Sequence, residues 1–347
     1  MLTAKQISLL EKNRLNTGLI IQEPLESDYL GGQLPYEIVV EDGDWSQWLP
    51  TGEKQKFARV ETMSCVSQAT SNSIDCQITR MIKLGLIETE PLIHWLDANG
   101  NFNSSDRFIA KMSGTTVNGN SLNNPSEAVR KFGVPPESIW GASEDFTWND
   151  YYRIPSKEAI DWGKRFLEYF DVAYEWVTKE YVWGKGIKGL QITQAELVEQ
   201  LKQAPIIIGA ATCAGWFNSD IIAACNLPAN HGTMVYKSVI PEYFGDFDSY
   251  EPWEKKINYW YKIPFAIKMI VTPREIIKKK ITNNPMAKLL KQENGKGYGL
   301  LLEAINPASL MGMAWAVGKT IPGELPDNVN WADLDAKLDG TYTLKNN

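Results

Sequence analysis

The clearest pattern along the chain is a helical spacing of apolar residues after Ser64. These apolar positions are Val66, Ala69, Ile74, Ile78, Met81, Ile82 and Leu84. They predict an amphipathic helix that ends at Gly85 and has Cys65 at its N-terminus. Similar but shorter patterns predict helices over residues 3–14, 125–132 and 157–170.

The second half of the chain changes to patterns that are typical of strands. Alternation of polar and apolar residues, or short apolar runs, predicts strands over residues 172–182, 205–211, 232–240, 243–249, 257–263 and 266–271. Two further helices are predicted over residues 193–203, with Thr193 as N-cap, and 273–281. Because helices come first and strands later, we expect an α+β fold in which an antiparallel sheet follows a helical lobe and a site lies between the lobes.

The composition indicates a globular protein. Of 347 residues, 44% are hydrophobic and 22% are charged, and the formal net charge of −7 argues against the basic surface that nucleic acid binding requires. Residues 1–16 mix charged residues with their leucines, so no secretory signal is visible, and the apolar stretches 206–211 and 221–225 are far shorter than the roughly 20 residues of a membrane span. We expect a soluble protein with neither a nucleic acid nor a membrane as partner.

The four cysteines do not form a metal-binding pattern. None of Cys65, Cys76, Cys213 and Cys225 lies in a Cys-x-x-Cys pair or near a histidine cluster, so we expect no metal site. On one helix Cys65 and Cys76 would lie about 16 Å apart, at roughly 1.5 Å per residue, which no disulfide can span. This usage suits a reducing compartment, although Cys213 and Cys225 could pair if a loop brought them together.

Cys65 is the strongest candidate for a nucleophile. A helix N-terminus favours the thiolate form of a cysteine. The chain has two histidines, and His94, beside Trp95, is interpreted as a structural or surface residue, which makes His231 the candidate base. Asp248 follows His231 by 17 residues, a separation that two neighbouring antiparallel strands would span, so the acid could orient the imidazole.

These residues also carry a family resemblance. Ser64-Cys65-Val66 resembles the nucleophile segment of papain-like cysteine peptidases, Asn230-His231-Gly232 resembles their histidine strand, and Asp248-Ser249-Tyr250 resembles their Asn-Ser-Trp. The segments Gly43-Asp44-Trp45, Leu49-Pro50, Gly52-Glu53-Lys54-Gln55 and Glu61-Thr62-Met63 are similar to a subgroup of this family that phages and bacteria often encode. The resemblance spans residues 42–271.

The resemblance implies a two-lobed papain-like fold and a cysteine peptidase that needs no cofactor. It divides the chain into an N-terminal arm (1–41), a peptidase domain (42–272) and a C-terminal extension (273–347). Arg59 stands where the family usually has its oxyanion-hole glutamine, so Gln55 becomes the candidate donor. Asp248 replaces the usual Asn and would strengthen the orienting hydrogen bond by adding charge. Val66 and Tyr250 stand where the family has tryptophans, which reduces the aromatic cover.

The expected substrate is a peptide or protein, and the candidate walls of its binding site are Trp216, Phe217 and Tyr250. Two other interpretations stay open. The same order of Cys, His and acid occurs in cell-wall amidases and in transglutaminase-like acyl transferases. A papain fold with weak or no activity could also serve as a structural or assembly protein of a phage particle, with phage structural proteins as partners. The expected location is the cytoplasm or the virion.

Overall fold

In the computed structural model, the described residues are 18–35, 37–178, 192–211, 221–222, 229–259 and 263–278, together with four short strands farther along the chain. The chain divides into two compact units, Met1–Lys278 and Lys279–Asn347. The second unit contains a four-stranded sheet in the order β11-β10-β9-β12. Its strands are β9 (Ala287–Gln292), β10 (Gly297–Leu302), β11 (Ile321–Pro322) and β12 (Tyr342–Leu344).

The first half of the larger unit is helical. Its helices are α2 (Cys65–Lys83), α3 (Asp106–Met112), α4 (Asn123–Phe132), α5 (Glu137–Trp140), α6 (Trp148–Tyr151) and α7 (Lys157–Tyr169), with the 3-10 helices η1 (Ser46–Trp48) and η2 (Glu90–Trp95). The three predicted helices that became α2, α4 and α7 are confirmed within two residues at each end. The predicted helix over residues 3–14 lies outside the described residues.

The second half of this unit builds an eight-stranded sheet in the order β1-β2-β8-β3-β5-β6-β7-β4. Its strands are β1 (Tyr29–Leu30), β2 (Phe170–Trp176), β3 (Ile206–Ala210), β4 (Ile221–Ile222), β5 (His231–Val239), β6 (Tyr243–Phe247), β7 (Glu254–Asn258) and β8 (Ala266–Pro273). The sheet is mixed, because its two edge strands pair in parallel and the six between them pair antiparallel. Helices followed by this sheet confirm the α+β fold class, whereas the expectation of an antiparallel sheet is wrong at its two edges, where β1 and β4 pair in parallel.

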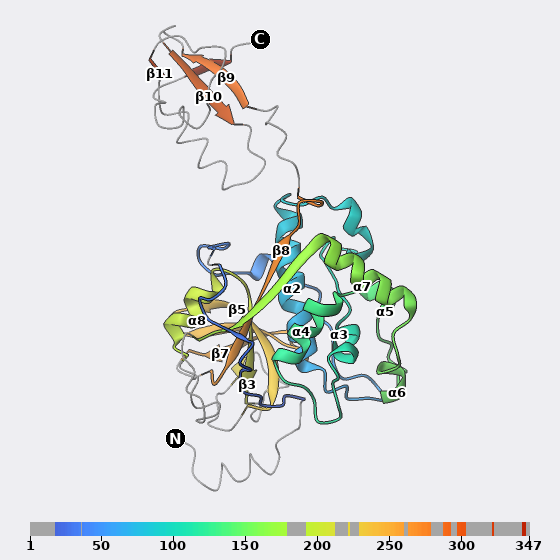
Figure 1. The fold of residues 1–347 in the computed structure, drawn as a ribbon. Coiled ribbons are helices and arrows are strands. Elements are labelled where there is room, and N and C mark those ends of the chain that lie inside the picture. Colours follow the sequence, from blue (N-terminus) through green and yellow to red (C-terminus); the bar gives the residue numbers. More distant parts are fainter. Residues whose placement is uncertain are drawn as a thin grey trace. The chain divides into compact units, whose positions relative to one another are not determined.

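Both faces of the sheet are covered, because strand side chains alternate between faces. On β3, Ile207 faces the core that includes α2, whereas Ile206 and Ile208 face a second core with Leu197 and Leu201 of α8 (Gln194–Leu201). Helix α2 packs against β5, β8 and β3, and α3 and α4 contact it as well (Figure 1). It is therefore buried along nearly all its length, and its N-terminus meets the start of β5.

Helix α8 begins as the sequence predicts. The Thr193 hydroxyl accepts a hydrogen bond from the Glu196 N–H at 3.1 Å, and the Glu196 carboxylate accepts one from the Thr193 N–H at 3.4 Å. This reciprocal arrangement is a capping box, which satisfies two N–H groups that the first helical turn leaves without intrahelical acceptors.

The structure corrects three elements. The strand predicted over residues 172–182 is β2, which ends at Trp176. Arg274–Lys278, at the start of the predicted helix 273–281, form a turn, because β8 pairs with β2 through Pro273 and the Ile277 carbonyl then accepts a hydrogen bond from the Glu88 N–H at 2.8 Å. Strand β7 ends at Asn258, so the prediction of 257–263 began too late; the alternation of buried Lys255 and Ile257 with more exposed neighbours sets its position.

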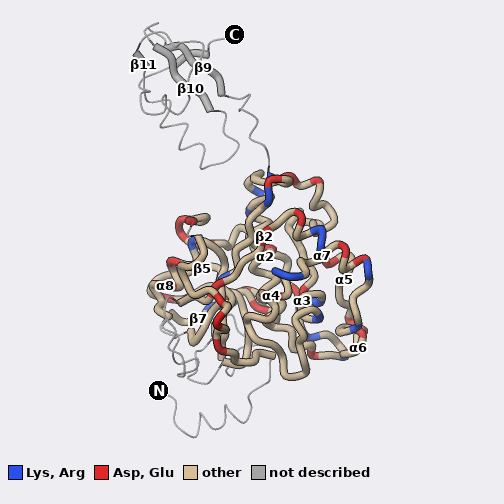
Figure 2. Tube along the Cα trace, in the orientation of Figure 1, with Lys and Arg blue, Asp and Glu red and all other residues tan. Residues whose placement is uncertain are grey.

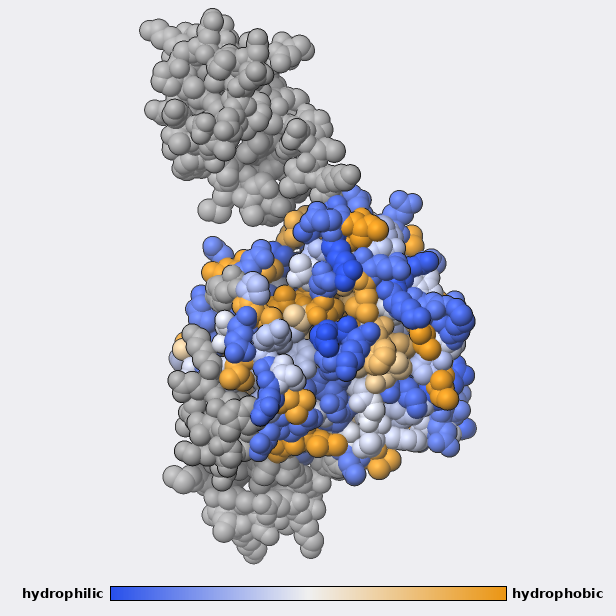
Figure 3. All heavy atoms as spheres, in the orientation of Figure 1, coloured by the Kyte–Doolittle hydropathy of each residue, from blue (hydrophilic) through white to orange (hydrophobic). Residues whose placement is uncertain are grey.

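The surface of the larger unit carries mixed charge. Figure 2 shows Lys and Arg interspersed with Asp and Glu along α5, α6 and α7. On the face drawn in Figure 3, apolar side chains lie in small groups among hydrophilic ones. Among the described residues, none of the helices combines the length and the hydrophobicity that spanning a bilayer requires.

Candidate active site

Cys65 is the first residue of α2, and its side chain is fully buried. The Gly232 backbone N–H donates a hydrogen bond to its Sγ at 3.3 Å. The preceding residue, Ser64, does not cap the helix with its side chain; its hydroxyl instead lies 2.6 Å from that of Thr62 and 3.3 Å from that of Tyr151. The sulfur therefore lies at the positive end of the α2 dipole with a backbone donor directed at it.

His231 is the first residue of β5 and lies between Cys65 and Asp248. Its Nε2 is 2.6 Å from Asp248 Oδ1, and Cys65 is near enough to help raise its pKa. Antiparallel pairing of β5 with β6 places the end of β6, where Asp248 follows, beside the start of β5. The predicted cysteine, histidine and acid are thus adjacent in the order that acyl transfer requires, with Nδ1 on the Cys65 side.

The buried charges of this group stabilise one another. Burial alone would lower the pKa of His231, but the negative charge and hydrogen bond of Asp248, together with Cys65, raise it to about 10. Burial likewise opposes the charge of Asp248, whose pKa is nevertheless lowered to about 2 by His231 and by Lys255. The Lys255 Nζ lies 3.0 Å from Asp248 Oδ2, so the carboxylate binds a different group with each oxygen. The imidazolium is therefore the favoured form of His231 at neutral pH.

A second carboxyl group lies behind this pair. Asp246, in β6, accepts hydrogen bonds from the Thr233 hydroxyl at 3.0 Å to each oxygen. Burial and the nearby charge of Asp248 raise the pKa of Asp246 to about 8. At pH 7 this carboxyl group is mostly protonated, whereas Asp248 is ionised.

Gln55 lies next to the group, but its amide is already hydrogen bonded. Its Nε2 donates to Glu61 Oε1 at 2.7 Å and to the Tyr250 hydroxyl oxygen at 3.0 Å, and its Oε1 accepts from the Ser249 hydroxyl at 2.8 Å. The Tyr250 hydroxyl donates to Glu61 Oε2 at 2.7 Å. As an oxyanion donor, Gln55 would have to exchange one of these two acceptors for the substrate oxygen.

Tyr250 also provides aromatic cover. The centroid of its ring lies 5.8 Å from that of His231. Trp216 and Phe217, the other two predicted substrate walls, lie outside the described residues, as do Cys213 and Cys225. His94 is exposed and packs on Trp162 at 4.9 Å between ring centroids, as its structural interpretation predicts.

The N-terminal arm runs beside the histidine. The Leu19 N–H donates to the Asn230 carbonyl at 3.2 Å, and Leu19 pairs in parallel with Asn120. Leu19 is buried, and a Cβ on Gly18 would overlap the Met63 carbonyl, so the arm follows the backbone on both sides of the site. Met63 is the described non-glycine residue with a positive φ, at 55°. The arm therefore covers backbone groups immediately before Cys65 and His231.

Several residues of this region were not predicted from the sequence. Glu61 binds Gln55 and Tyr250, Lys255 binds Asp248, and Asp246 lies behind it, yet each of these residues has the sequence context of an ordinary surface charge. Their contacts depend on tertiary packing that no local pattern encodes. Farther from the sulfur, Glu53, Asp106 and Glu137 form an acidic cluster that could hold a metal ion, whereas the sequence search for metal ligands considered cysteines and histidines.

Comparisons with known proteins give structural similarity at low sequence identity. No family model and no curated protein matches the chain. Procathepsin L 3 of the larval midgut of Tenebrio molitor is similar at 15% identity and a TM-score of 0.47, over 74% of this chain and 76% of that chain. Xylellain, a cysteine protease from Xylella fastidiosa, is similar at 15% identity and a TM-score of 0.47, over 76% and 96%. ProCathepsin B S9 from Trypanosoma congolense is similar at 10% identity and a TM-score of 0.45, over 79% and 98%. These neighbours are papain-like cysteine proteases, and what this chain does has to be argued from its own residues.

Proposed function

We propose that this chain is a cysteine peptidase with Cys65 as nucleophile, His231 as acid and base, and Asp248 as the residue that orients His231. One observation carries the proposal: a buried histidine lies 2.6 Å from a carboxylate and near a cysteine at a helix N-terminus. This is the arrangement that nucleophilic catalysis by a thiolate requires. Peptides or unfolded proteins are the proposed substrates.

The reaction divides into two transfers. The Cys65 thiolate forms a bond to the carbonyl carbon of the substrate, and the negative charge moves to the carbonyl oxygen. His231 Nδ1–H protonates the amine as the C–N bond breaks, which leaves a thioester on Cys65. Neutral His231 then takes a proton from water, whose oxygen displaces the sulfur, and the acid product leaves. The α2 N-terminus, including the Cys65 N–H, and Gln55 are the candidate donors to the transient oxyanion.

Substitution of Cys65 by Ala tests the assignment. The variant should hydrolyse no peptide substrate and should lose the rapid reaction with a thiol-directed electrophile. Cys76 is the matched control, because it lies on the same helix, is equally buried, and burial raises its pKa well above the usual range. Cys76→Ala should keep both activity and labelling. Rapid labelling that survives in Cys65→Ala would place the nucleophile elsewhere.

A second candidate function is a structural or assembly protein, as in a phage particle, with weak or no activity. The observation that favours it is the Gln55 amide, whose Nε2 is held by Glu61 and Tyr250. Under this function Cys65 would react no faster than Cys76, and the chain would co-purify in a particle of fixed stoichiometry. A cell-wall amidase, which shares the acyl-transfer chemistry, would digest peptidoglycan and leave unfolded protein intact.

A further inference from the structure

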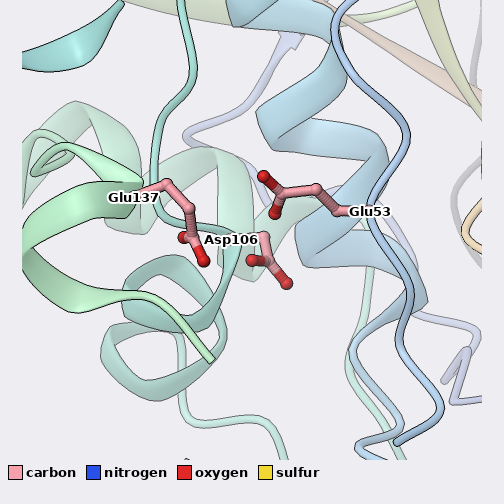
Figure 4. Close-up of side chains that lie close together, drawn as sticks. All are labelled: Glu53, Asp106 and Glu137. Atoms are coloured by element: carbon pink, nitrogen blue, oxygen red, sulfur yellow. The ribbon is translucent and has the colours of Figure 1, made fainter. Parts of the chain in front are cut away.

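Three acidic side chains from separate segments meet in the helical half of the larger unit. Glu53 comes from the segment that leads to Gln55, Asp106 is the first residue of α3, and Glu137 is the first residue of α5. One oxygen of each lies within 4.8 Å of an oxygen of the other two. Figure 4 shows the three carboxyl groups directed toward one another. None of these residues takes part in the proposed acyl transfer.

Arg107 is the guanidinium nearest to the cluster. It is close to Asp106 and Glu137, but its Nε and Nη1 donate to the carbonyl oxygens of Tyr151 and Gly141 at 2.7 and 2.8 Å. When all three carboxyl groups are ionised, they carry three negative charges beside the single positive charge of Arg107. A divalent cation would neutralise the remaining two.

One oxygen of the cluster has no partner. Within the described part of the chain, Glu137 Oε2 is buried without a hydrogen bond, whereas its Oε1 accepts from the Ala142 N–H at 3.2 Å. A buried carboxylate oxygen without a partner costs free energy, because it has lost water without gaining a hydrogen bond. Figure 4 shows the Glu137 carboxyl group, to which this oxygen belongs, directed at Asp106.

We propose that Glu53, Asp106 and Glu137 bind a divalent cation, and that this cation is calcium. The donors are all oxygens, which calcium prefers, and three carboxylates can supply up to six of its six to eight ligands. Calcium binds oxygens at about 2.3–2.6 Å, so oxygens on opposite sides of it lie roughly 4.8 Å apart. The oxygens of the cluster are already within that separation of one another.

Such a cation would connect the cluster to the start of α2. Asp106 Oδ2 accepts hydrogen bonds from Gln68 Nε2 at 2.6 Å and from the Tyr151 hydroxyl at 3.0 Å, and the Tyr151 hydroxyl oxygen also lies 3.3 Å from that of Ser64. Glu53 lies two residues before Gln55. A bound cation would hold together the loop that carries Gln55, the first turn of α3 and the first turn of α5.

Two measurements on the full chain test the proposal. After treatment with a chelator, addition of calcium should raise the melting temperature. Terbium, which occupies calcium sites, should show luminescence when tryptophan is excited, since Trp140 is on the same short helix as Glu137. Calcium should displace terbium. In Glu137→Gln the calcium affinity should fall at least about tenfold, because one charged ligand is lost. Glu144→Gln is the matched control, since Glu144 pairs with Lys54 at the surface and should leave the affinity unchanged.

The possible results distinguish a calcium site from a protonated cluster and from a site for another ion. No calcium-dependent rise in melting temperature, or terbium that calcium does not displace, would show that protons neutralise the cluster and would overturn the site. Binding of magnesium or manganese but not calcium would overturn the assignment of the ion. If Glu137→Gln does not fold, Glu53→Gln and the wild-type terbium titration decide the question. Both readouts are independent of peptide hydrolysis, so a failed peptidase assay would leave this test intact.

Discussion

Replacement of Asp248 by Asn probes the charge that holds His231 in its imidazolium form. The substitution keeps the shape of the side chain and removes its negative charge. Burial, the largest influence on His231, then acts without the charge and charge-assisted hydrogen bond of Asp248, so its pKa should fall from about 10 to the ordinary 6.5 or lower. The Lys255 ammonium, now without its carboxylate 3.0 Å away, disfavours the imidazolium further.

The expected effect on catalysis follows from the fraction of imidazolium. At pH 8 a pKa of about 10 leaves His231 almost fully protonated, whereas a pKa of 6.5 leaves roughly one molecule in thirty protonated. The kcat/KM at pH 8 should therefore fall about thirtyfold, and the alkaline limb of its pH profile should move below pH 7. An alkaline limb that does not move would refute the reasoning, because Asp248 would then not be what keeps His231 charged.

Thermal unfolding measures the same interaction independently. The lowered pKa of Asp248 stabilises the fold above its unfolded pKa near 4, and this contribution is lost as the pH falls through about 2. The raised pKa of His231 stabilises the fold below its unfolded pKa near 6.5, and this contribution is lost as the pH rises through about 10. The melting temperature of the wild type should therefore exceed that of Asp248→Asn by the largest amount between about pH 4 and pH 6.5. Loss of one partner from a buried ion pair costs about 3–5 kcal/mol.

Asp246→Asn is the matched control for both measurements. Asp246 lies two residues before Asp248 and is equally buried, but its pKa of about 8 means that the substitution removes little charge at pH 7. At pH 7 and below it should leave kcat/KM and the melting temperature close to those of the wild type. If both variants lower these values equally, the effect would belong to the packing of β6 instead of to the charge of Asp248.

Three further predictions follow from contacts around the sulfur. Glu61→Ala should raise kcat/KM severalfold, because Gln55 Nε2 loses a charged acceptor at 2.7 Å and can donate to the substrate oxyanion instead. An unchanged or lower value in steady-state kinetics would mean that Gln55 has a structural role. In Gly232→Ala the new Cβ would lie 2.8 Å from Val66 Cγ2, so the fold should lose about 1–3 kcal/mol in denaturant titration and Cys65 should label more slowly. Adding Val66→Ala to this variant should restore part of the stability and part of the labelling rate of Cys65. If neither recovers, this clash is not the cause. Deletion of residues 1–21 should raise kcat/KM for peptides, because Leu19 no longer covers the Asn230 carbonyl; an unchanged value would show that the arm does not compete with substrate.

Long periodic elements could be predicted from the sequence, whereas tertiary neighbours could not. Helix α2 and its first residue were predictable because the apolar spacing extends over five turns. Helix α3 was missed because its seven residues bury Phe108, Ile109 and Ala110 in one run, which has no helical period. The end of β8 was misjudged because continued pairing with β2, and not local propensity, determines where the strand stops.

The residues of the candidate site also include some that could be predicted from the sequence and some that could not. The order of Cys65, His231 and Asp248 identified the three residues, and antiparallel pairing of β5 with β6 made their contact predictable. Glu61 and Lys255 were not predictable, since a charged residue in a loop or on a strand gives no sign of which side chain it binds. The cluster of Glu53, Asp106 and Glu137 joins three segments that no sequence spacing relates. Its detection required the packing of α3, α5 and the loop before Gln55.

The arm and the body of the protein touch at two glycines, and this contact gives experimental control over the arm. Gly18 and Gly119 have φ angles of 100° and 95°, and a Cβ on Gly119 would overlap the Gly18 carbonyl oxygen. A single methyl group at position 119 would therefore clash with the Gly18 backbone and push the two segments apart. Gly119→Ala could lift the arm while leaving its whole sequence, and every residue that contacts the Cys65 sulfur, unchanged.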